Sequence, residues 1–346
     1  MSETMQRVAL AERPIGAPGD HNFRLETIEI PALCDDDVLV EIEYMSLDPY
    51  MRGRMDDAKS YASPVPIGGT MEGGAVGRVI ASNSSKFAIG DFAFGQLGWA
   101  SHGCVPAREL RKLDPDLMPI TTALGVLGMP GFTGWYGLKE HGRPKNGETL
   151  VVAAATGPVG SMVGQIAKTH GLHVVGIAGG IKKCALAVEQ FGFDHCLDHK
   201  AYEDSRSMRT ALQELCPNGI DIYFENVAGK TLDAILPLMN TGARIPICGM
   251  ISWYNAGALG ANAGGETDKL PKMWRSILVK KMSVNGFIIS DHWDRYSDFL
   301  SDVAPMLSAG QIAYKEDIVV GLKNAPKAFM GLLEGHNFGK LIVKIK

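Results

Sequence analysis

The turn at residues 155–160, which reads Ala-Thr-Gly-Pro-Val-Gly, constrains the fold more than any other feature of the 346-residue chain. The apolar run 150–154 before it predicts a buried strand, and apolar side chains in residues 159–167 after it recur at helical spacing. A dinucleotide site needs this arrangement. Gly157 lets the backbone approach a pyrophosphate, Gly160 lets the helix pack on the strand, and the helix N-terminus attracts phosphate. The alternative is a tight turn in an α/β protein that binds no dinucleotide.

From residue 149 onward, strand-like and helix-like segments alternate, which predicts a parallel sheet covered by helices on both faces. Strands are expected at residues 150–154, 173–178, 221–224, 244–248 and 283–289, with helices at 184–191 and 232–239. The first hundred residues instead read as short β-rich runs separated by glycine turns, which predicts a small β-barrel-like domain. The tail, residues 340–345, alternates like a half-exposed strand and suits that first domain. We therefore predict two domains, one at 1–125 completed by 305–346 and one at 126–304.

Composition and charge exclude several classes of protein. Hydrophobic residues make up 46% of the chain and charged residues 21%, and the formal net charge is -4 without a long run of either sign. We therefore expect no nucleic-acid partner and no anionic membrane partner. Two long uncharged stretches, 117–138 and 149–167, are interrupted by proline and glycine, so neither is expected to span a membrane. The N-terminus lacks an apolar signal segment, so the cytoplasm is the expected location.

The second predicted strand indicates which dinucleotide is bound. NAD-binding folds place an acidic residue about 20 residues beyond the glycine motif to hold the ribose 2′-hydroxyl. Here residues 178–183 read Ala-Gly-Gly-Ile-Lys-Lys, so two ammonium groups stand where a carboxylate would repel a 2′-phosphate. The alternative is that Lys182 and Lys183 only solubilise a helix start. Because lysine in a first helical turn opposes the macrodipole, a nearby anion explains it better and NADP is favoured.

Metal binding is not expected. The six cysteines are dispersed, without a C-x-x-C pair, at positions Cys34, Cys104, Cys184, Cys196, Cys216 and Cys248. Catalytic zinc needs three protein ligands and structural zinc needs closely spaced cysteines. His102 and Cys104 form an isolated pair of the kind that is usually ordinary loop chemistry. We predict reduced, mostly structural thiols and no zinc.

Five ordered motifs together resemble a known family. They are residues 47–55 (Leu-Asp-Pro-Tyr-Met-Arg-Gly-Arg-Met), the turn at 155–160, residues 225–227 (Glu-Asn-Val), residues 245–249 (Ile-Pro-Ile-Cys-Gly) and residues 337–340 (Asn-Phe-Gly-Lys). The chain resembles the zinc-free medium-chain dehydrogenases/reductases and, more narrowly, bacterial curcumin reductases, plant alkenal double-bond reductases and animal prostaglandin reductases. The resemblance covers essentially the whole chain, and five ordered motifs are far more specific than one glycine turn.

The resemblance implies an α/β fold in which a GroES-like β-rich catalytic domain is combined with a Rossmann domain, a doubly wound parallel sheet. It further implies a homodimer that binds NADPH and reduces the carbon-carbon double bond of an α,β-unsaturated ketone or aldehyde. By family position, the cofactor would contact Gly157, Pro158, Val159, Gly160, Ser161, Lys183, His199, Asn226, Cys248, Gly249, Ile251, Ser252, Tyr254, Phe287, Ile288, Ile289 and Asn337. Prostaglandin reductases have a tyrosine where this chain has His199, whereas curcumin reductases share the histidine.

The chemistry of such a reduction suggests candidate catalytic residues. Hydride delivered to the β-carbon leaves negative charge on the carbonyl oxygen, so the site needs a hydrogen-bond donor there. Tyr50 is the first candidate and Tyr254 the second, because a phenol is both a donor and an aromatic wall. Tyr61, Trp253 and Phe287 are candidates for binding a small hydrophobic enone or alkenal. The cofactor's ribose hydroxyl or a water could supply the proton instead, and any of the tyrosines could be plain packing.

Two other functions remain open from the sequence. A quinone reductase of the same superfamily would share the fold and NADPH, and a non-catalytic NADPH-binding protein would share the nucleotide site. The motif at residues 47–55 favours double-bond reduction, because it is typical of the double-bond reductases.

Overall fold

The computed structural model describes residues 4–263 and 269–346. The N-terminal signal prediction concerns residues that lie partly outside this range. Contacts divide the chain into two compact units. The first contains Met1–Gly128, Tyr254–Leu259 and Glu316–Lys346, and the second contains Met129–Trp253 and Gly260–Lys315.

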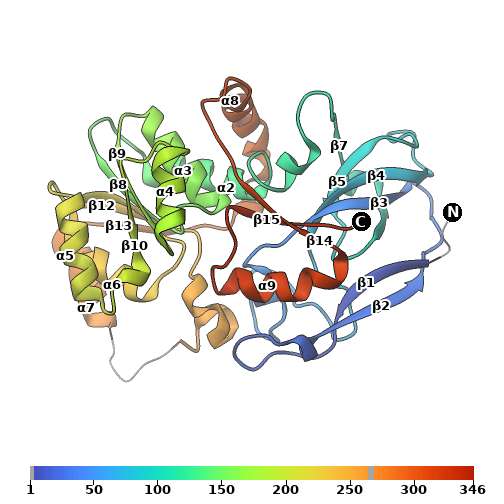
Figure 1. Ribbon diagram of the computed structural model, residues 1–346, viewed down its shortest axis with the longest axis horizontal. Coiled ribbons are helices and arrows are strands. Elements are labelled where there is room, and N and C mark those ends of the chain that lie inside the picture. Colours follow the sequence, from blue (N-terminus) through green and yellow to red (C-terminus); the bar gives the residue numbers. More distant parts are fainter. Residues whose placement is uncertain (1–3, 264–268) are drawn as a thin grey trace. The chain divides into compact units, whose positions relative to one another are not determined.

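The first unit is built on a mixed sheet of seven strands in which β3 is the central element (Figure 1). The order is β14-β15-β3-β4-β5-β7, β6 also pairs with β3, and β1 and β2 form a separate antiparallel pair. The strands are β1 (Thr4–Leu10), β2 (Phe23–Glu29), β3 (Asp37–Ser46), β4 (Gly74–Ser82), β5 (Phe92–Gln96), β6 (His102–Pro106), β7 (Arg111–Leu113), β14 (Glu316–Val320) and β15 (Lys340–Lys344). The helices are α1 (Met51–Arg54), α9 (Ala325–Leu333) and the short turns η1 (Asp20–Asn22), η2 (Ala107–Glu109), η3 (Ile120–Leu124) and η10 (Leu322–Asn324).

The core of the first unit is centred on three aromatic rings from distant parts of the sequence. Phe23 stacks on Trp99 with ring centroids 5.7 Å apart, and Phe329 meets Trp99 edge-on at 5.4 Å. These contacts join β2, the segment after β5 and helix α9 in one hydrophobic cluster. Such aromatic pairs add to the stabilisation that comes from buried area alone.

The C-terminal strand β15 belongs to the first unit, where it pairs antiparallel with β3 and parallel with β14. All four residues Lys340–Val343 are buried, so the prediction of a half-exposed strand is wrong. The physical reason is that both faces are covered: Leu341 and Val343 enter one hydrophobic cluster, while Ile342 enters another.

The second unit is a six-stranded parallel sheet in the order β10-β9-β8-β11-β12-β13. The strands are β8 (Thr149–Ala153), β9 (His173–Ala178), β10 (His195–Asp198), β11 (Ile220–Phe224), β12 (Met239–Ile247) and β13 (Ser283–Gly286). The helices are α2 (Met129–Tyr136), the π-helical η4 (Gly137–Gly142), α3 (Pro158–Thr169), α4 (Ile181–Glu189), α5 (Ser205–Leu215), α6 (Gly229–Ile235), α7 (Leu270–Lys280) and α8 (Tyr296–Ser308). Short 3-10 turns are η5 (His199–Ala201), η6 (Leu236–Leu238), η7 (Ile251–Ala256), η8 (Ala258–Gly260) and η9 (Ile289–Arg295).

This strand order has one functional consequence. The direction of winding reverses between β8 and β11, and ligands of open α/β sheets bind at the carboxyl ends of the strands at such a switch point. The fold thus confirms the prediction of a β-rich unit combined with a doubly wound parallel sheet. Among the described helices, none is both long enough and apolar enough to cross a bilayer.

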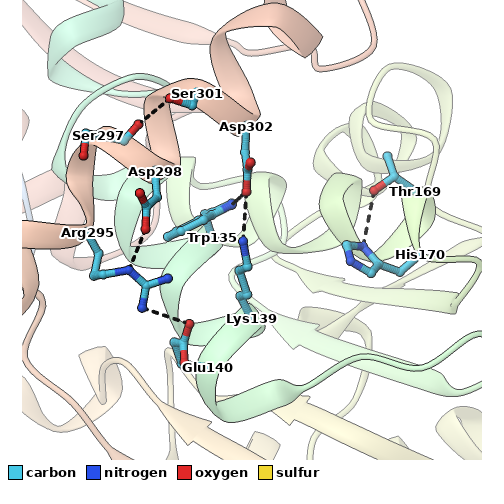
Figure 2. A network of polar contacts seen from close by, with 10 residues as sticks. All are labelled: Trp135, Lys139, Glu140, Thr169, His170, Arg295, Ser297, Asp298, Ser301 and Asp302. Carbon is cyan, nitrogen blue, oxygen red and sulfur yellow. Dashed lines mark hydrogen bonds and ion pairs between the residues drawn. The ribbon is translucent and has the colours of Figure 1, made fainter.

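The predicted boundary at residue 305 falls inside helix α8, which polar contacts tie to the second unit (Figure 2). Asp302 accepts hydrogen bonds from Trp135 Nε1 at 3.1 Å and from Lys139 Nζ at 3.0 Å. These partners lie on α2 and η4, so α8 stays whole within that unit. The contacts accordingly place the end of the second unit at Lys315.

Candidate active site

The turn after β8 leads directly into the N-terminus of α3. Ala154 has a left-handed conformation (φ 52°), and Gly157 is extended immediately before the helix. Pro158 occupies the first helical turn, and no side-chain cap bonds to this end of α3 within the described chain. The N–H groups of the first turn therefore remain as donors for an anion, which the helix dipole also favours.

Gly160 is required by a close approach of backbone. A Cβ atom at this position would lie 2.4 Å from the Ala154 carbonyl oxygen, and one at Gly157 would lie 3.3 Å from the same oxygen. Ser161 N–H donates to the Gly157 carbonyl at 2.9 Å, which starts the helical ladder. The structure thus brings the predicted residues 157–161 into one narrow turn that fits a pyrophosphate, and Gly160 lets the helix pack closely against the backbone of that turn.

The turn between β9 and α4 carries a cluster of cations. The His199 ring lies against this turn, since a Cβ atom on Gly179 would be 3.0 Å from His199 Nε2. Lys230 Nζ donates to the His199 carbonyl at 3.1 Å. Burial lowers the pKa of His199, and the charges of Lys230, Lys200 and Lys183 lower it further. The predicted pair Lys183 and His199 therefore lies together, and these lysines make the region attractive to a phosphate.

Further predicted residues gather at the carboxyl ends of β11 and β12. Asn226 Nδ2 donates to the Ala153 carbonyl at 2.8 Å, which bridges the ends of β11 and β8 at the switch point. The backbone N–H groups of residues 248, 249, 251 and 252 donate to the carbonyls of residues 225–227 at 3.0–3.2 Å. Burial raises the pKa of the Cys248 thiol to about 12, so this thiol stays protonated. Two hydrogen-bonded loops at the carboxyl ends of β11 and β12 thus carry the predicted residues Asn226, Cys248, Gly249, Ile251 and Ser252.

A buried carboxylate holds the loop after β11 in place. Glu225 is 2% exposed, and its Oε1 accepts hydrogen bonds from Tyr223 OH at 2.8 Å, Val227 N at 2.7 Å and Ala228 N at 2.8 Å. Its Oε2 has no hydrogen-bond partner among the described residues. Burial raises the pKa of Glu225. The side chain fixes the loop that carries Asn226, because three donors converge on one oxygen.

Phe287 lies just after β13 and packs inside the second unit. Its ring centroid is 5.2 Å from that of His141, and a Cβ atom on Gly137 would come within 2.5 Å of Phe287 Cζ. The ring therefore belongs to an aromatic cluster with η4, and residues 288–289 continue the same segment. Trp253 lies in η7, half-buried, in this unit as well.

In the first unit, Tyr50 and Tyr61 gather around one guanidinium. Arg54 Cζ lies 5.7 Å from the centroid of the Tyr50 ring and 4.4 Å from that of Tyr61, and its Nε is 3.4 Å from Glu72 Oε2. Arg54 is buried, whereas Tyr61 is 48% exposed. Burial raises the pKa of the Tyr50 phenol, and the charges of Asp48 and Glu72 raise it further. The phenol is therefore held in its protonated, hydrogen-bond-donating form.

A buried ion pair joins two of the sequence motifs in this unit. Lys340 is 3% exposed, and its Nζ lies 2.6 Å from Asp48 Oδ1 and 3.0 Å from the Leu47 carbonyl oxygen. Burial lowers the pKa of Lys340. Asn337, in the same motif as Lys340, donates from Nδ2 to the Gly339 carbonyl at 2.7 Å and so folds onto its own loop. The loop that carries Tyr50 is thus anchored to the C-terminal strand.

The segment Tyr254–Leu259 also belongs to the first unit. Ala258 N–H donates to Asp56 Oδ2 at 2.9 Å, and Asp56 Oδ1 pairs with Arg52 at 2.6 Å. The segment is thereby attached to the end of α1, the helix that follows Tyr50. Tyr50, Tyr61 and Tyr254 consequently lie in one unit, while Trp253 and Phe287 lie in the other.

No group of three or more His, Cys, Asp and Glu side chains could hold a metal ion within residues 4–263 and 269–346. His102 Nδ1 lies 2.9 Å from Ser101 Oγ, and Cys104 Sγ lies 4.0 Å from Asp37 Oδ2. Both side chains thus have ordinary polar neighbours. The absence of zinc stays a prediction that elemental analysis of the purified protein would test.

Two family models match the chain. Residues 6–113 match the N-terminal domain of oxidoreductase, and residues 158–304 match zinc-binding dehydrogenase. The NADPH-dependent curcumin reductase of Escherichia coli (strain K12) is 48% identical over 341 residues, covering 98% of this chain and 96% of that protein. The chain belongs to the medium-chain dehydrogenase/reductase family.

Other members of the family are similar over the same length. The 2-alkenal reductase (NADP(+)-dependent) of Nicotiana tabacum is 37% identical over 345 residues, covering 98% of this chain and 97% of that protein. The crystal structure of CurA in complex with NADPH from Vibrio vulnificus is 49% identical with a TM-score of 0.92, covering 99% of each chain. The predicted family is therefore confirmed across both units.

Sequence reasoning did not assign roles to several residues of the site. Arg54 and Glu225 lie inside recognised motifs, but their burial and their partners depend on the folded chain. The position of Lys230 in the sequence could have predicted its place in the cationic region around His199. Lys230 lies in the first turn of α6, where a cation opposes the helix dipole, and the same argument predicts a phosphate near Lys183.

Proposed function

We propose that this chain catalyses the NADPH-dependent reduction of the carbon-carbon double bond of α,β-unsaturated ketones or aldehydes. The observation that carries the proposal is 48% identity over 98% of the chain with an NADPH-dependent curcumin reductase. The likeness to a 2-alkenal reductase supports the same reaction class. A small hydrophobic enone or alkenal is the proposed substrate. The second unit would supply most of the cofactor contacts, and the first unit would supply the candidate donors Tyr50 and Tyr254.

NADPH is the proposed cofactor, and when bound it supplies the hydride that adds to the β-carbon. Residues 157–161 would hold its pyrophosphate, because they form the uncapped N-terminus of α3, whose N–H groups and dipole favour an anion. Lys183 would hold the 2′-phosphate with Lys200 and Lys230 nearby, and His199 would lie beside the adenine ribose. The remaining proposed contacts are Asn226, Cys248, Gly249, Ile251, Ser252, Tyr254, Phe287, Ile288, Ile289 and Asn337. Because the Phe287 ring packs against Gly137, its backbone is the part we assign to the cofactor.

Tyr50 is the proposed donor to the carbonyl oxygen of the substrate. Charge develops on this oxygen as the β-carbon is reduced, and one aimed donor stabilises such a transition state by about 3–4 kcal/mol. The raised pKa keeps the Tyr50 phenol protonated for this role. Tyr61, being half-exposed beside Arg54, would form an aromatic wall for the enone. Trp253, half-buried in the second unit, is a further proposed substrate contact. Tyr254 is the second candidate donor.

We further propose a cytoplasmic homodimer without a bound metal. Helix α7 supports the dimer because it exposes large apolar side chains, with Trp274 62% and Leu278 78% accessible. Strand β13 lies at the edge of the parallel sheet, and its unpaired backbone groups also support pairing with a second copy. Light scattering should give twice the monomer mass, and Trp274→Glu should halve it. A monomeric mass for the wild-type protein would remove this part of the proposal.

The reaction is tested by initial rates of NADPH oxidation with an aromatic enone, a simple alkenal and a quinone in parallel, each repeated with NADH. Rapid turnover of the enone and the alkenal with NADPH is expected. Turnover of the quinone alone would assign the chain to quinone reduction, and binding of NADPH without any turnover would indicate a non-catalytic protein. Equal rates with NADH would remove the role assigned to Lys183.

A further inference from the structure

Two cysteines in the second unit face each other across the N-terminal turn of α4. Cys184 lies in the first turn of that helix and Cys196 lies on strand β10, and their sulfur atoms are 2.9 Å apart. The two sulfur atoms are therefore in direct contact, closer than two sulfur atoms come without a hydrogen bond between them. Formation of a disulfide, with a bond of about 2.05 Å, would require a movement of less than about 1 Å.

The backbone around the pair is already held in place. Asp198, two residues beyond Cys196, accepts a hydrogen bond from Gly180 N at 2.7 Å. Cys184 N–H donates to the Gly180 carbonyl at 3.2 Å, which fixes the first turn of α4. The turn and the strand are therefore connected independently of the thiols. A covalent bond between the sulfurs would add to an existing contact rather than create one.

The two thiols differ in acidity in the way that disulfide formation needs. Cys196 donates its S–H to Cys184, which lowers the pKa of Cys184, while the same hydrogen bond raises the pKa of Cys196. Burial raises the pKa of Cys216 to about 12 and also raises that of Cys104. Within this hydrogen-bonded pair, Cys184 is therefore favoured as the thiolate, the nucleophilic form.

We propose that Cys184 and Cys196 form a reversible oxidation site that reacts with hydroperoxides. The Cys184 thiolate attacks the peroxide oxygen, the O–O bond breaks, and an alcohol or water leaves while Cys184 becomes a sulfenic acid. The Cys196 sulfur then attacks the Cys184 sulfur, the S–O bond breaks, and water leaves with the Cys196 proton. The two sulfurs lose two electrons, which reduce the peroxide, and a dithiol reductant reverses the step.

Oxidation would also affect the cofactor, a consequence that rests on the proposed NADPH site. Lys183 immediately precedes Cys184, in the same helical turn. Shortening the sulfur separation from 2.9 Å should shift the first turn of α4 by less than about 1 Å toward β10, and Lys183 with it. The disulfide should therefore raise the KM for NADPH several-fold and leave kcat unchanged.

Mass spectrometry tests the oxidation site directly in the full-length wild-type protein. Trypsin cleaves after Lys183 and Lys200, so both cysteines fall in one peptide, residues 184–200. After treatment with hydrogen peroxide and alkylation, this peptide should have lost two hydrogens and carry no alkyl group. Chymotryptic cleavage at Phe191 or Phe193 should leave two fragments joined until a dithiol is added. Two of the six thiols should disappear in total.

Three outcomes would overturn the proposal: both thiols in peptide 184–200 remain alkylatable, this peptide gains oxygen without loss of two hydrogens, or Cys34 reacts first. Cys196→Ser should abolish the loss of two hydrogens, and Cys34→Ser, at an exposed site, should leave it intact as the matched control. Kinetics of the oxidised wild-type protein separately test the effect of the disulfide on NADPH binding. An unchanged KM for NADPH with the disulfide present would contradict the link to Lys183 alone, and failure of the enzyme to use NADPH at all would instead contradict the proposed function.

Discussion

The two units hold their candidate functional groups in place by different physical means. In the second unit, the nucleotide turn is shaped by backbone that approaches backbone, and Gly160 is required because a Cβ atom would lie 2.4 Å from a carbonyl oxygen. In the first unit, the loop carrying Tyr50 is anchored by buried charges, with Lys340 and Asp48 paired at 2.6 Å. One site depends on the absence of a side chain, and the other depends on the presence of two.

This difference determines what each site tolerates and how visible it is in the sequence. A glycine turn is local, so it leaves a readable motif of six residues between a strand and a helix. The ion pair joins residues 292 positions apart, and neither partner reveals the other until the chain is folded. A backbone site should fail through steric strain, whereas a buried ion pair should fail through an uncompensated charge.

The largest effect is expected from Lys340→Met. The substitution leaves the Asp48 carboxylate buried without its cation, so the free energy of unfolding should fall by about 3–5 kcal/mol. Urea denaturation measures this change. The matched control is the double variant with Asp48→Asn, which removes both charges and should recover much of the loss. A loss that the double variant does not reduce would show that the ion pair is not the anchor.

Tyr50→Phe tests the chemical role of the anchored loop. The change removes one donor to the developing charge, so kcat for an enone should fall about 10²–10³-fold while the KM for NADPH stays the same. Tyr61→Phe is the control, because it removes a phenol beside the same Arg54 guanidinium but should leave kcat nearly unchanged. If Tyr50→Phe kept wild-type turnover at saturating NADPH, its role as donor would have to be abandoned.

The pH dependence of kcat is a second test of Tyr50 as the hydrogen-bond donor. A phenol donates only while protonated, and burial raises the pKa of Tyr50 above its ordinary value. Donation is lost only as pH rises through that raised pKa, so kcat should not fall as the solution passes about pH 10, the usual tyrosine value. Stopped-flow measurements after a brief pH jump avoid slow unfolding. A decline centred near pH 10 would contradict an environment that protects the protonated form.

Gly160→Ala tests the backbone site. The added methyl group meets the Ala154 carbonyl, so stability should fall by about 1–3 kcal/mol, and the KM for NADPH should rise because the turn must open. Gly331→Ala is the matched control in helix α9, where the nearest atom would be a His336 nitrogen at 3.5 Å, an ordinary contact. Equal behaviour of the two alanine variants would refute the steric argument.

The smallest effect is expected from Lys183→Ala. Removing one cation from a phosphate contact should lower the preference for NADPH over NADH about tenfold, or ~1.4 kcal/mol, since Lys200 and Lys230 remain. Lys182→Ala, at an exposed neighbouring position, should leave the preference unchanged. Ratios of kcat/KM for the two cofactors provide the measurement. If Lys182→Ala changed the cofactor preference more than Lys183→Ala did, the contact with the 2′-phosphate would be assigned to Lys182 instead.

The sequence predicted the parts of the molecule that depend on local patterns. The strand, glycine turn and helix around Gly157 have the predicted types and nearly the predicted bounds, because a buried strand and an amphipathic helix each leave a periodic signal. Strand β10 was missed, since its four residues include histidine and aspartate and lack a long apolar run. The strand order was also beyond prediction, because it depends on pairings between strands that are not consecutive.

The candidate site likewise contains some residues that local sequence patterns predict and others that only the folded chain shows. A role for Lys183 could be predicted from its position in a helix start. The environments of Arg54, between two tyrosines, and of Glu225, which holds the loop of Asn226, depend on packing that the sequence does not show. The half-exposed tail predicted from alternation at residues 340–345 is a buried strand, because it is covered on both faces by core from distant segments.

The central claim is that hydride goes to the β-carbon of an enone while a protein donor stabilises the carbonyl oxygen. The most direct measurement is NMR of the product formed from an aromatic enone and NADPH deuterated at the transferable position of the nicotinamide. The account predicts a saturated ketone with one deuterium on the β-carbon and an intact carbonyl group. An allylic alcohol with deuterium on the carbonyl carbon, or no labelled product at all, would contradict it.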